Sequence, residues 1–137
     1  MDKLEYIPGD LVSVYVGIKK FIVEVIGVEN ENEVLSYQIK FPNGEIQYAD
    51  KDNIVPIPLT PEILEKNGWT CYRSEGECFG HRWYKHQEYP FTLRYNNFLG
   101  IIGVSFNDGK DDTVMIKCVD ELQHILYGLQ LDSNLKI

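Results

Sequence analysis

Short stretches in which apolar and polar residues alternate, separated by turn residues, fill the first 57 positions of the chain. Residues 10–16 and 34–41 alternate in this way, and residues 20–28 are rich in β-branched side chains. Asn43-Gly44 supplies a two-residue turn that needs positive φ. Alternation continues over residues 46–48, and a last short run at 54–55 ends at a proline. Five short strands in so few residues predict a closed β-barrel, because closure removes the exposed edges of a flat sheet.

A proline-rich connector follows these strands and marks the best domain boundary. Three prolines fall within residues 56–61, and proline cannot donate a hydrogen bond to a sheet. Thr60-Pro61-Glu62 then favours a helix start, with an N-cap, a proline at the first helical position and an acidic first turn. We therefore predict two domains, residues 1–57 and residues 58–137.

The second part has the pattern of an antiparallel sheet with two helices. The short first helix ends at Asn67-Gly68, and aromatic residues crowd the segment 69–98. We predict strands near residues 69–73, 79–86, 90–96, 99–106 and 112–117, the last two joined around a turn at Asn107-Asp-Gly109. A final helix over residues 119–131 carries an apolar stripe at helical spacing, formed by Val119, Leu122, Ile125, Leu126 and Leu129.

Three segments of the first part carry a resemblance to a known fold. They are Pro8-Gly9-Asp10 before the first strand, Phe41-Pro-Asn-Gly-Glu45 at the tight turn and Asp52-Asn-Ile-Val-Pro56 at the closing strand. In these segments the chain resembles SH3-like barrels of the Tudor and KOW type. The resemblance implies an SH3-like five-stranded β-barrel for residues 1–57.

The second part carries a different resemblance. It extends from Pro58-Leu-Thr-Pro-Glu-Ile-Leu-Glu-Lys-Asn-Gly-Trp69 to Val119-Asp-Glu-Leu-Gln123 and resembles a family of small uncharacterised proteins of gut anaerobic bacteria and their mobile elements. This resemblance implies a fold and an accessory-genome setting, a prophage or mobile element, and no reaction. The predicted fold class is α+β: an N-terminal SH3-like barrel, then an antiparallel sheet with two helices.

Both parts of the chain are acidic, and the formal net charge is −8. Residues 1–57 hold five Lys and ten acidic residues, and residues 58–137 hold eight basic and eleven acidic residues. This charge disfavours nonspecific binding to nucleic acid and to anionic membranes. No stretch approaches the roughly 18 apolar residues of a membrane helix, and we expect no leader segment. Three cysteines, an odd number, fit reduced thiols, so we expect a cytoplasmic protein with no membrane partner.

The segment Asp120-Glu-Leu-Gln-His124 resembles the zincin motif H-E-x-x-H with its first histidine replaced. In that motif two histidines one helical turn apart bind zinc, and the glutamate activates water. Asp120 can also bind zinc, but no third ligand follows in the sequence. The simpler interpretation, which we favour, is that Asp120 and Glu121 complement the helix N-terminus while Gln123 and His124 face solvent.

Cys71, Cys78, His81 and His86 form a second candidate metal site. Four such ligands within sixteen residues suit a tetrahedral zinc ion. Their spacing lacks a C-x2-C knuckle, however, and free cysteine is usually a small buried hydrophobic residue. We therefore favour part-buried thiols and surface histidines at these positions, and we expect no cofactor.

Arg82, Trp83, Lys85 and Arg94 form the one locally basic, aromatic segment. Arginine interleaved with aromatic residues can stack bases and hold phosphates, although alternating aromatics in strands are more often core. In the first part, Tyr15 lies on the Ser13 face rather than the valine face. The Tudor-type resemblance implies an aromatic cage for a cationic ligand, and Tyr15 is the aromatic that lies outside the core face. We favour the alternative, a barrel that packs on its neighbour and holds no such ligand.

No catalytic constellation in the sequence is complete. We therefore predict a non-enzymatic binding or adaptor protein, whose partner is a protein, a second copy of the chain or a cationic ligand. A nucleic-acid-associated module and a zinc-binding protein are the two alternatives.

Overall fold

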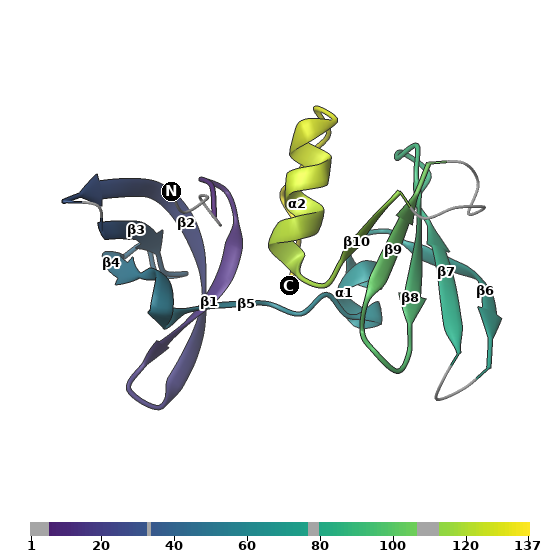
Figure 1. The fold of residues 1–137 in the computed structure, drawn as a ribbon, viewed down its shortest axis with the longest axis horizontal. Coiled ribbons are helices and arrows are strands. Elements are labelled where there is room, and N and C mark those ends of the chain that lie inside the picture. The colour runs from purple at the N-terminus through teal and green to yellow at the C-terminus, as the bar shows by residue number, and fades with distance from the viewer. Residues whose placement is uncertain (1–5, 33, 77–79, 107–112) are drawn as a thin grey trace.

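The computed structural model describes residues 6–32, 34–76, 80–106 and 113–137. The fold is mostly β, with two antiparallel sheets of five strands each. Helix α2 (Val119–Gly128) stands between the two sheets, and the connector from β5 to α1 passes below it (Figure 1). Because the two helices have only six and ten residues, the predicted α+β class is wrong.

The first sheet has the strand order β4-β3-β2-β1-β5. Its strands are β1 (Leu11–Val16), β2 (Lys19–Glu31), β3 (Val34–Lys40), β4 (Ile46–Asp50) and β5 (Ile54–Pro56), with the 3-10 turn η1 (Lys51–Asn53) before β5. The β3–β4 connection differs from the predicted two-residue turn. The Phe41 N–H donates to Glu45 O, so a three-residue loop remains, and only Gly44 takes a positive φ. This is the loop type in which glycine follows a tight turn.

The predicted SH3-like barrel is wrong, because neither sheet closes on itself. Strands β4 and β5 are the two edges of the first sheet, and no ladder joins them among the described residues. Strand β5 has three residues and pairs with β1 only over Val12–Val14. Strand β5 is too short to pair with a second strand as well, and Pro56 has no N–H to donate.

The first sheet nevertheless covers an apolar core on the face that the alternation predicts. Val12, Val14, Val23 and Val25 are buried there. Three aromatic residues, Tyr6, Tyr37 and Phe41, belong to the same buried cluster, and the rings of Tyr6 and Tyr37 meet edge to face. Burial of these side chains stabilises the sheet without closure.

The second sheet has the order β10-β9-β8-β7-β6. Its strands are β6 (Thr70–Glu75), β7 (His81–Lys85), β8 (Thr92–Asn96), β9 (Ile102–Ser105) and β10 (Val114–Ile116). One face packs against α1 and α2, and Tyr84, Leu93, Ile102 and Val104 are fully buried on it. The five predicted strands are thus present, while the predicted turn at 107–109 lies outside the described residues.

Both predicted helix starts are confirmed. Helix α1 (Pro61–Lys66) has Thr60 as its N-cap, whose hydroxyl accepts the Ile63 N–H at 3.3 Å. Helix α2 begins at Val119, where Glu121 Oε1 accepts the N–H groups of Lys117 and Cys118. It ends at Gly128, three residues before the predicted end, and Leu129 is part-exposed rather than buried in the apolar stripe.

Among the residues that the structure describes, no strand ladder joins one sheet to the other. The ladders of the first sheet use residues 11–56 and those of the second use residues 70–116. The division into domains at residue 57 stays a prediction. Within the described part of the chain, no helix is long and apolar enough to cross a membrane.

A candidate cation site between the first sheet and the last helix

The turn before β1 carries a buried carboxylate. Asp10 is 2% exposed, and its Oδ2 accepts the N–H of Ile7 at 2.9 Å. The Asp10 N–H donates back to Ile7 O at 3.1 Å. Gly9, with φ of +100°, allows the chain to turn here, and its own N–H bonds to Val25 O. The side chain of Asp10 therefore has a fixed position at the entrance to the first sheet.

Helix α2 turns a polar face toward this turn. Asp120, Gln123 and His124 lie at positions i, i+3 and i+4, which share one side of a helix. Gln123 is 2% exposed. Its Oε1 accepts the Leu11 N–H at 2.8 Å, and its Nε2 donates to Gly9 O and to Ser133 O, each at 3.0 Å. The prediction that Gln123 faces solvent is wrong, because this face of α2 packs on the first sheet.

His124 is also drawn into this contact. Its Nε2 lies 2.6 Å from Asp10 Oδ2, so the ring and the carboxylate share a hydrogen bond. About a third of the His124 side chain stays exposed, while the Asp10 side chain is buried. The predicted solvent-facing position is therefore wrong for His124 as well. Asp10, 114 residues away in the sequence, thus lies where a third ligand of the zincin-like segment would be needed.

Asp120 completes the group. One ligand atom from each of Asp10, Asp120 and His124 lies within 4.8 Å of the other two. Asp120 is 6% exposed, and no donor among the described residues reaches its Oδ1. Burial and the nearby charge of Asp10 raise the pKa of the Asp120 carboxyl to about 6. Above that pH this carboxyl is a buried anion, and one of its two oxygens has no donor among the described residues.

A pocket of about 280 Å³ lies beside Asp120. The other residues that line it are Tyr6, Pro56, Cys118 and Glu121. Burial raises the pKa of the Cys118 thiol to about 11, with Asp120 and Glu121 adding to the effect. The pocket therefore offers two carboxyl groups and an un-ionised thiol, and its lining includes no basic side chain from the described part of the chain.

The structure places the predicted ligands of the second metal site along the β6–β7 hairpin. Cys71 lies opposite Tyr84, and His81 lies opposite Glu75, at the other end of the ladder. His86 lies beyond β7, where its Nε2 contacts Asn67 O at 3.0 Å and its Nδ1 accepts the Glu88 N–H at 3.1 Å. Both ring nitrogens of His86 thus have backbone partners. Cys78 lies outside the described residues, so the four-residue site stays a prediction.

The basic, aromatic residues divide between the two faces of the second sheet. Trp83 pairs with Arg94, and alternation puts Lys85 on the same outer face. Arg82 shares the opposite face with the buried Tyr84. The guanidinium carbon of Arg73 lies 4.5 Å from the centre of the Trp83 ring, so one face of this ring is already covered.

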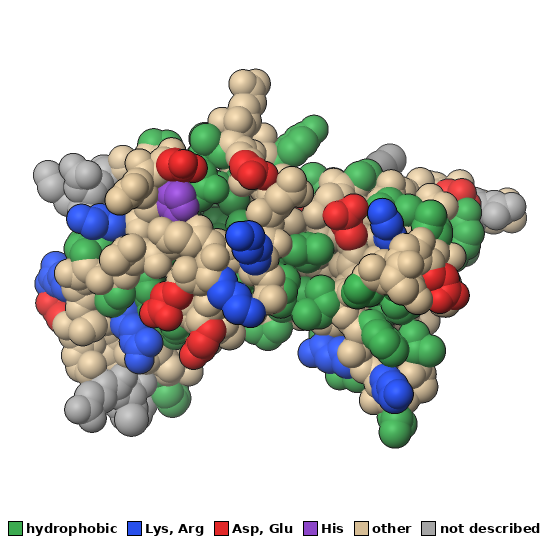
Figure 2. All heavy atoms as spheres, turned by 180° about the vertical axis from the view of Figure 1, so that it is seen from behind, with side chains coloured by type: hydrophobic (Ala, Val, Ile, Leu, Met, Phe, Trp, Pro, Cys, Tyr) green, Lys and Arg blue, Asp and Glu red, His purple; other side chains and the backbone are tan. Residues whose placement is uncertain are grey.

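The last predicted binding residue, Tyr15, lies on the first sheet. It is half-exposed near the end of the β1–β2 hairpin and pairs with Lys20. This hairpin projects from the body of the molecule, and Figure 2 shows apolar side chains at its tip with basic side chains beside them. The predicted binding residues therefore lie on three separate surfaces, namely the two faces of the second sheet and the β1–β2 hairpin, and none of these includes the Asp10–Asp120–His124 group.

Comparison of the chain with protein-family models, curated proteins and solved structures gave no match. The two resemblances stated from the sequence therefore stay predictions. The functional interpretation depends on the geometry of this chain alone.

Sequence reasoning found Asp120 and His124 but missed Asp10. The separation of 114 residues between Asp10 and His124 leaves no local signal that links them.

Proposed function

We propose that this protein is a non-enzymatic binding protein whose ligand is a cation, bound between the first sheet and helix α2. The observation that carries the proposal is the buried carboxylate of Asp120, which has an unpartnered oxygen beside the carboxylate of Asp10. Burying an ionised carboxylate without a partner costs free energy. A cation at this position would offset that cost, and the acidic pocket next to it is open to such a ligand.

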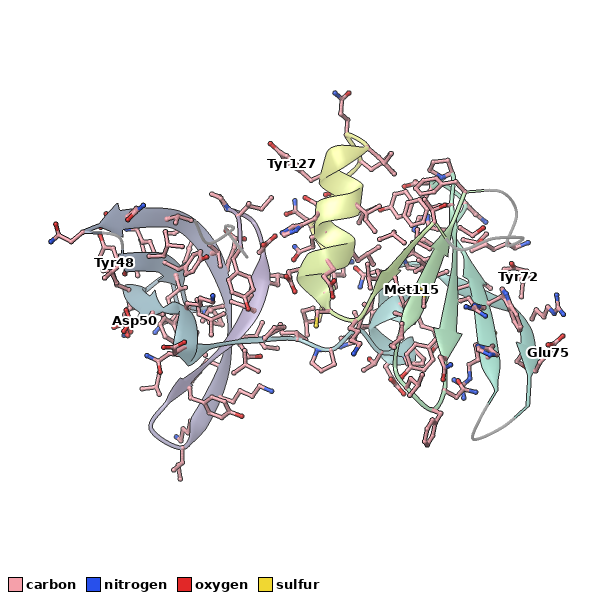
Figure 3. All side chains as sticks on the ribbon, in the orientation of Figure 1. Tyr48, Asp50, Tyr72, Glu75, Met115 and Tyr127 are labelled. Carbon is pink, nitrogen blue, oxygen red and sulfur yellow. The ribbon has the colours of Figure 1, made fainter. Side chains whose placement is uncertain are left out.

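The test is a thermal-melt screen at pH 7.5 after exhaustive dialysis against a chelator. Mg²⁺, Ca²⁺, Mn²⁺, Zn²⁺ and methylammonium are each added to the wild type, to Asp120→Asn and to Asp50→Asn. Asp50 is exposed on β4 and points away from the site (Figure 3), so Asp50→Asn controls for the loss of one surface charge.

At least one of these cations is expected to raise the melting temperature of the wild type and of Asp50→Asn. A ligand at 100 times its Kd stabilises the folded state by about 2.7 kcal/mol. The same cation should leave Asp120→Asn unchanged. A wild type whose melting temperature responds to none of the five cations would overturn the proposed function.

A protein partner or self-association is a second candidate, favoured by the apolar tip of the β1–β2 hairpin. Ile18 is 98% exposed there, and Val16 and Tyr15 beside it are half-exposed. Light scattering tests self-association: if the tip joins two copies, the molar mass is that of a dimer for the wild type and of a monomer for Ile18→Ser. A wild-type monomer at high concentration would exclude a second copy as the partner.

We also propose that the protein is cytoplasmic. Cys71 and Cys118 are free thiols in the structure, as expected in a reducing compartment. The accessory-genome setting stays a prediction.

A further inference from the structure

We infer that the cation is a divalent transition metal of the zinc class, bound by a carboxylate oxygen of Asp10, a carboxylate oxygen of Asp120 and the Nε2 atom of His124. This inference rests on the proposed cation-binding function and specifies its ligand. It concerns the three residues that the fold gathers from the two ends of the chain.

The imidazole decides the class of cation. Ca²⁺ and Mg²⁺ take oxygen ligands almost exclusively, whereas Zn²⁺ and its neighbours bind imidazole nitrogen together with carboxylate oxygen. His124 Nε2 is the ring atom directed at the site, 2.6 Å from Asp10 Oδ2. An organic ammonium ion would use both carboxylates but would gain nothing from this ring.

The distances fit a small ion after one local movement. In a tetrahedral zinc site, two ligand atoms lie about 3.4 Å apart, because each is about 2.1 Å from the metal. The three ligand atoms lie within 4.8 Å of one another, so any separation longer than about 3.4 Å must shrink, and the 2.6 Å between His124 and Asp10 must widen. His124 is the ligand free to move, because about a third of its side chain is exposed. Asp10 is held by the Ile7 N–H.

The ligands are supported by a second layer of hydrogen bonds. Gln123 binds backbone atoms on both sides of Asp10, namely Gly9 O and Leu11 N. It lies on the helix next to His124 and so fixes the spacing between the turn and α2. Such outer contacts orient metal ligands and tune their affinity.

Three protein ligands leave one coordination position open. Structural zinc sites are usually closed by four protein ligands, whereas a three-ligand site keeps a place for water or an added ligand. Asp120 belongs both to the ligand group and to the wall of the 280 Å³ pocket. An exchangeable ligand can therefore reach the metal from that side.

The test measures Zn²⁺ affinity by competition with a chromophoric chelator, on chelator-dialysed full-length protein. The variants are Asp10→Asn, Asp120→Asn and His124→Asn, with His81→Asn as the matched histidine control. His81 belongs to the alternative site on the β6–β7 hairpin, so this control also separates the two zinc hypotheses. Visible absorption of the Co²⁺ form gives a second readout, since four-coordinate Co²⁺ absorbs far more strongly than six-coordinate Co²⁺.

The expected result is one Zn²⁺ per chain for the wild type and for His81→Asn, with an intense Co²⁺ spectrum. Each of the three ligand variants should lose more than about 100-fold in Zn²⁺ affinity, above the 10–100-fold typical of outer-layer changes. Far-ultraviolet circular dichroism and the melting temperature confirm that each variant is folded.

Two results would overturn the inference while the proposed function stands. One is a wild type that binds Ca²⁺, Mg²⁺ or methylammonium but not Zn²⁺. The other is Zn²⁺ affinity unchanged in His124→Asn but lost in Asp120→Asn. Loss of zinc only in His81→Asn would overturn both the inference and the proposed function, because the cation would then lie at the β6–β7 hairpin. Absence of any bound cation would overturn both the inference and the proposed function.

Discussion

Replacing Asp120 by asparagine is expected to stabilise the metal-free protein at neutral and alkaline pH. The carboxyl is 6% exposed, its Oδ1 has no partner among the described residues, and Asp10 lies close by. Asparagine keeps the shape of the side chain and removes the charge. A substitution that removes the proposed function should therefore strengthen the fold, as is common where a site stores unfavourable charge.

The size and sign follow from the pKa. Burial, with the charge of Asp10, raises the pKa of Asp120 from 3.8 to about 6 on folding. The folded protein binds the Asp120 proton more tightly than the unfolded chain does. Protonation of Asp120 therefore adds to the free energy of unfolding, and this contribution is fully present below pH 3.8. That stability is lost as the pH rises through 6. A pKa shift of about two units corresponds to about 3 kcal/mol of unfolding free energy. At pH 8 the wild type should therefore be less stable than Asp120→Asn by about this amount.

Urea unfolding between pH 4 and pH 8, with chelator present, measures this difference. We expect the free energies of unfolding of wild type and Asp120→Asn to be similar near pH 4. Near pH 8 they should differ by about 3 kcal/mol, or roughly 10 °C in melting temperature for a chain of this size. Asp50→Asn should show no such trend. A difference between wild type and Asp120→Asn that is constant with pH would refute a buried carboxyl that titrates near 6.

Other substitutions test the packing, each by urea unfolding against the wild type. Gln123→Ala should cost about 3 kcal/mol, because backbone groups on the turn before β1 lose their partner; a cost near zero would mean that the turn and α2 are not tied. Gly68→Ala should cost about 2 kcal/mol, since φ is +87° and the added Cβ would lie 2.8 Å from His86 Nε2. Leu126→Ala should cost about 3 kcal/mol in a fully buried site. Ile18→Ser should change stability by less than about 0.5 kcal/mol, and a larger loss would show that the hairpin tip is not exposed.

Local chemistry made several elements predictable. The N-cap, proline and acidic residue at Thr60-Pro61-Glu62 act within one turn, so the start of α1 follows from the sequence. Alternation in β1 likewise identifies Val12 and Val14 as core. Closure of a barrel is different, because it depends on whether two distant edges meet. The residue pattern of a single strand does not indicate whether the two edge strands pair with each other. Strand β5 is short and contains Pro56, which limits the hydrogen bonds it can form to another strand.

The candidate site shows the same division. The spacing of Asp120 and His124 on one helix face is local and was visible in the sequence. The sequence did not show what this helix face contacts. Helix α2 packs on both sheets, whereas its apolar stripe indicates only the contact with the second sheet. From the apolar stripe we predict that the opposite face of α2 is exposed to solvent. The buried Gln123 shows that this opposite face is a second interface, with the first sheet.

The position of α2 also has a consequence for how the chain folds. Leu11 and Gln123 are 112 residues apart, so their hydrogen bond closes a loop that includes nearly the whole chain. During synthesis on the ribosome, the turn with Asp10 emerges long before the helix that covers it. Until α2 has been synthesised, the carboxylate of Asp10 therefore stays exposed to water. We expect docking of α2 onto the first sheet to be a late, slow step of folding. A nascent chain released before residue 119 would lack the element that joins its two sheets.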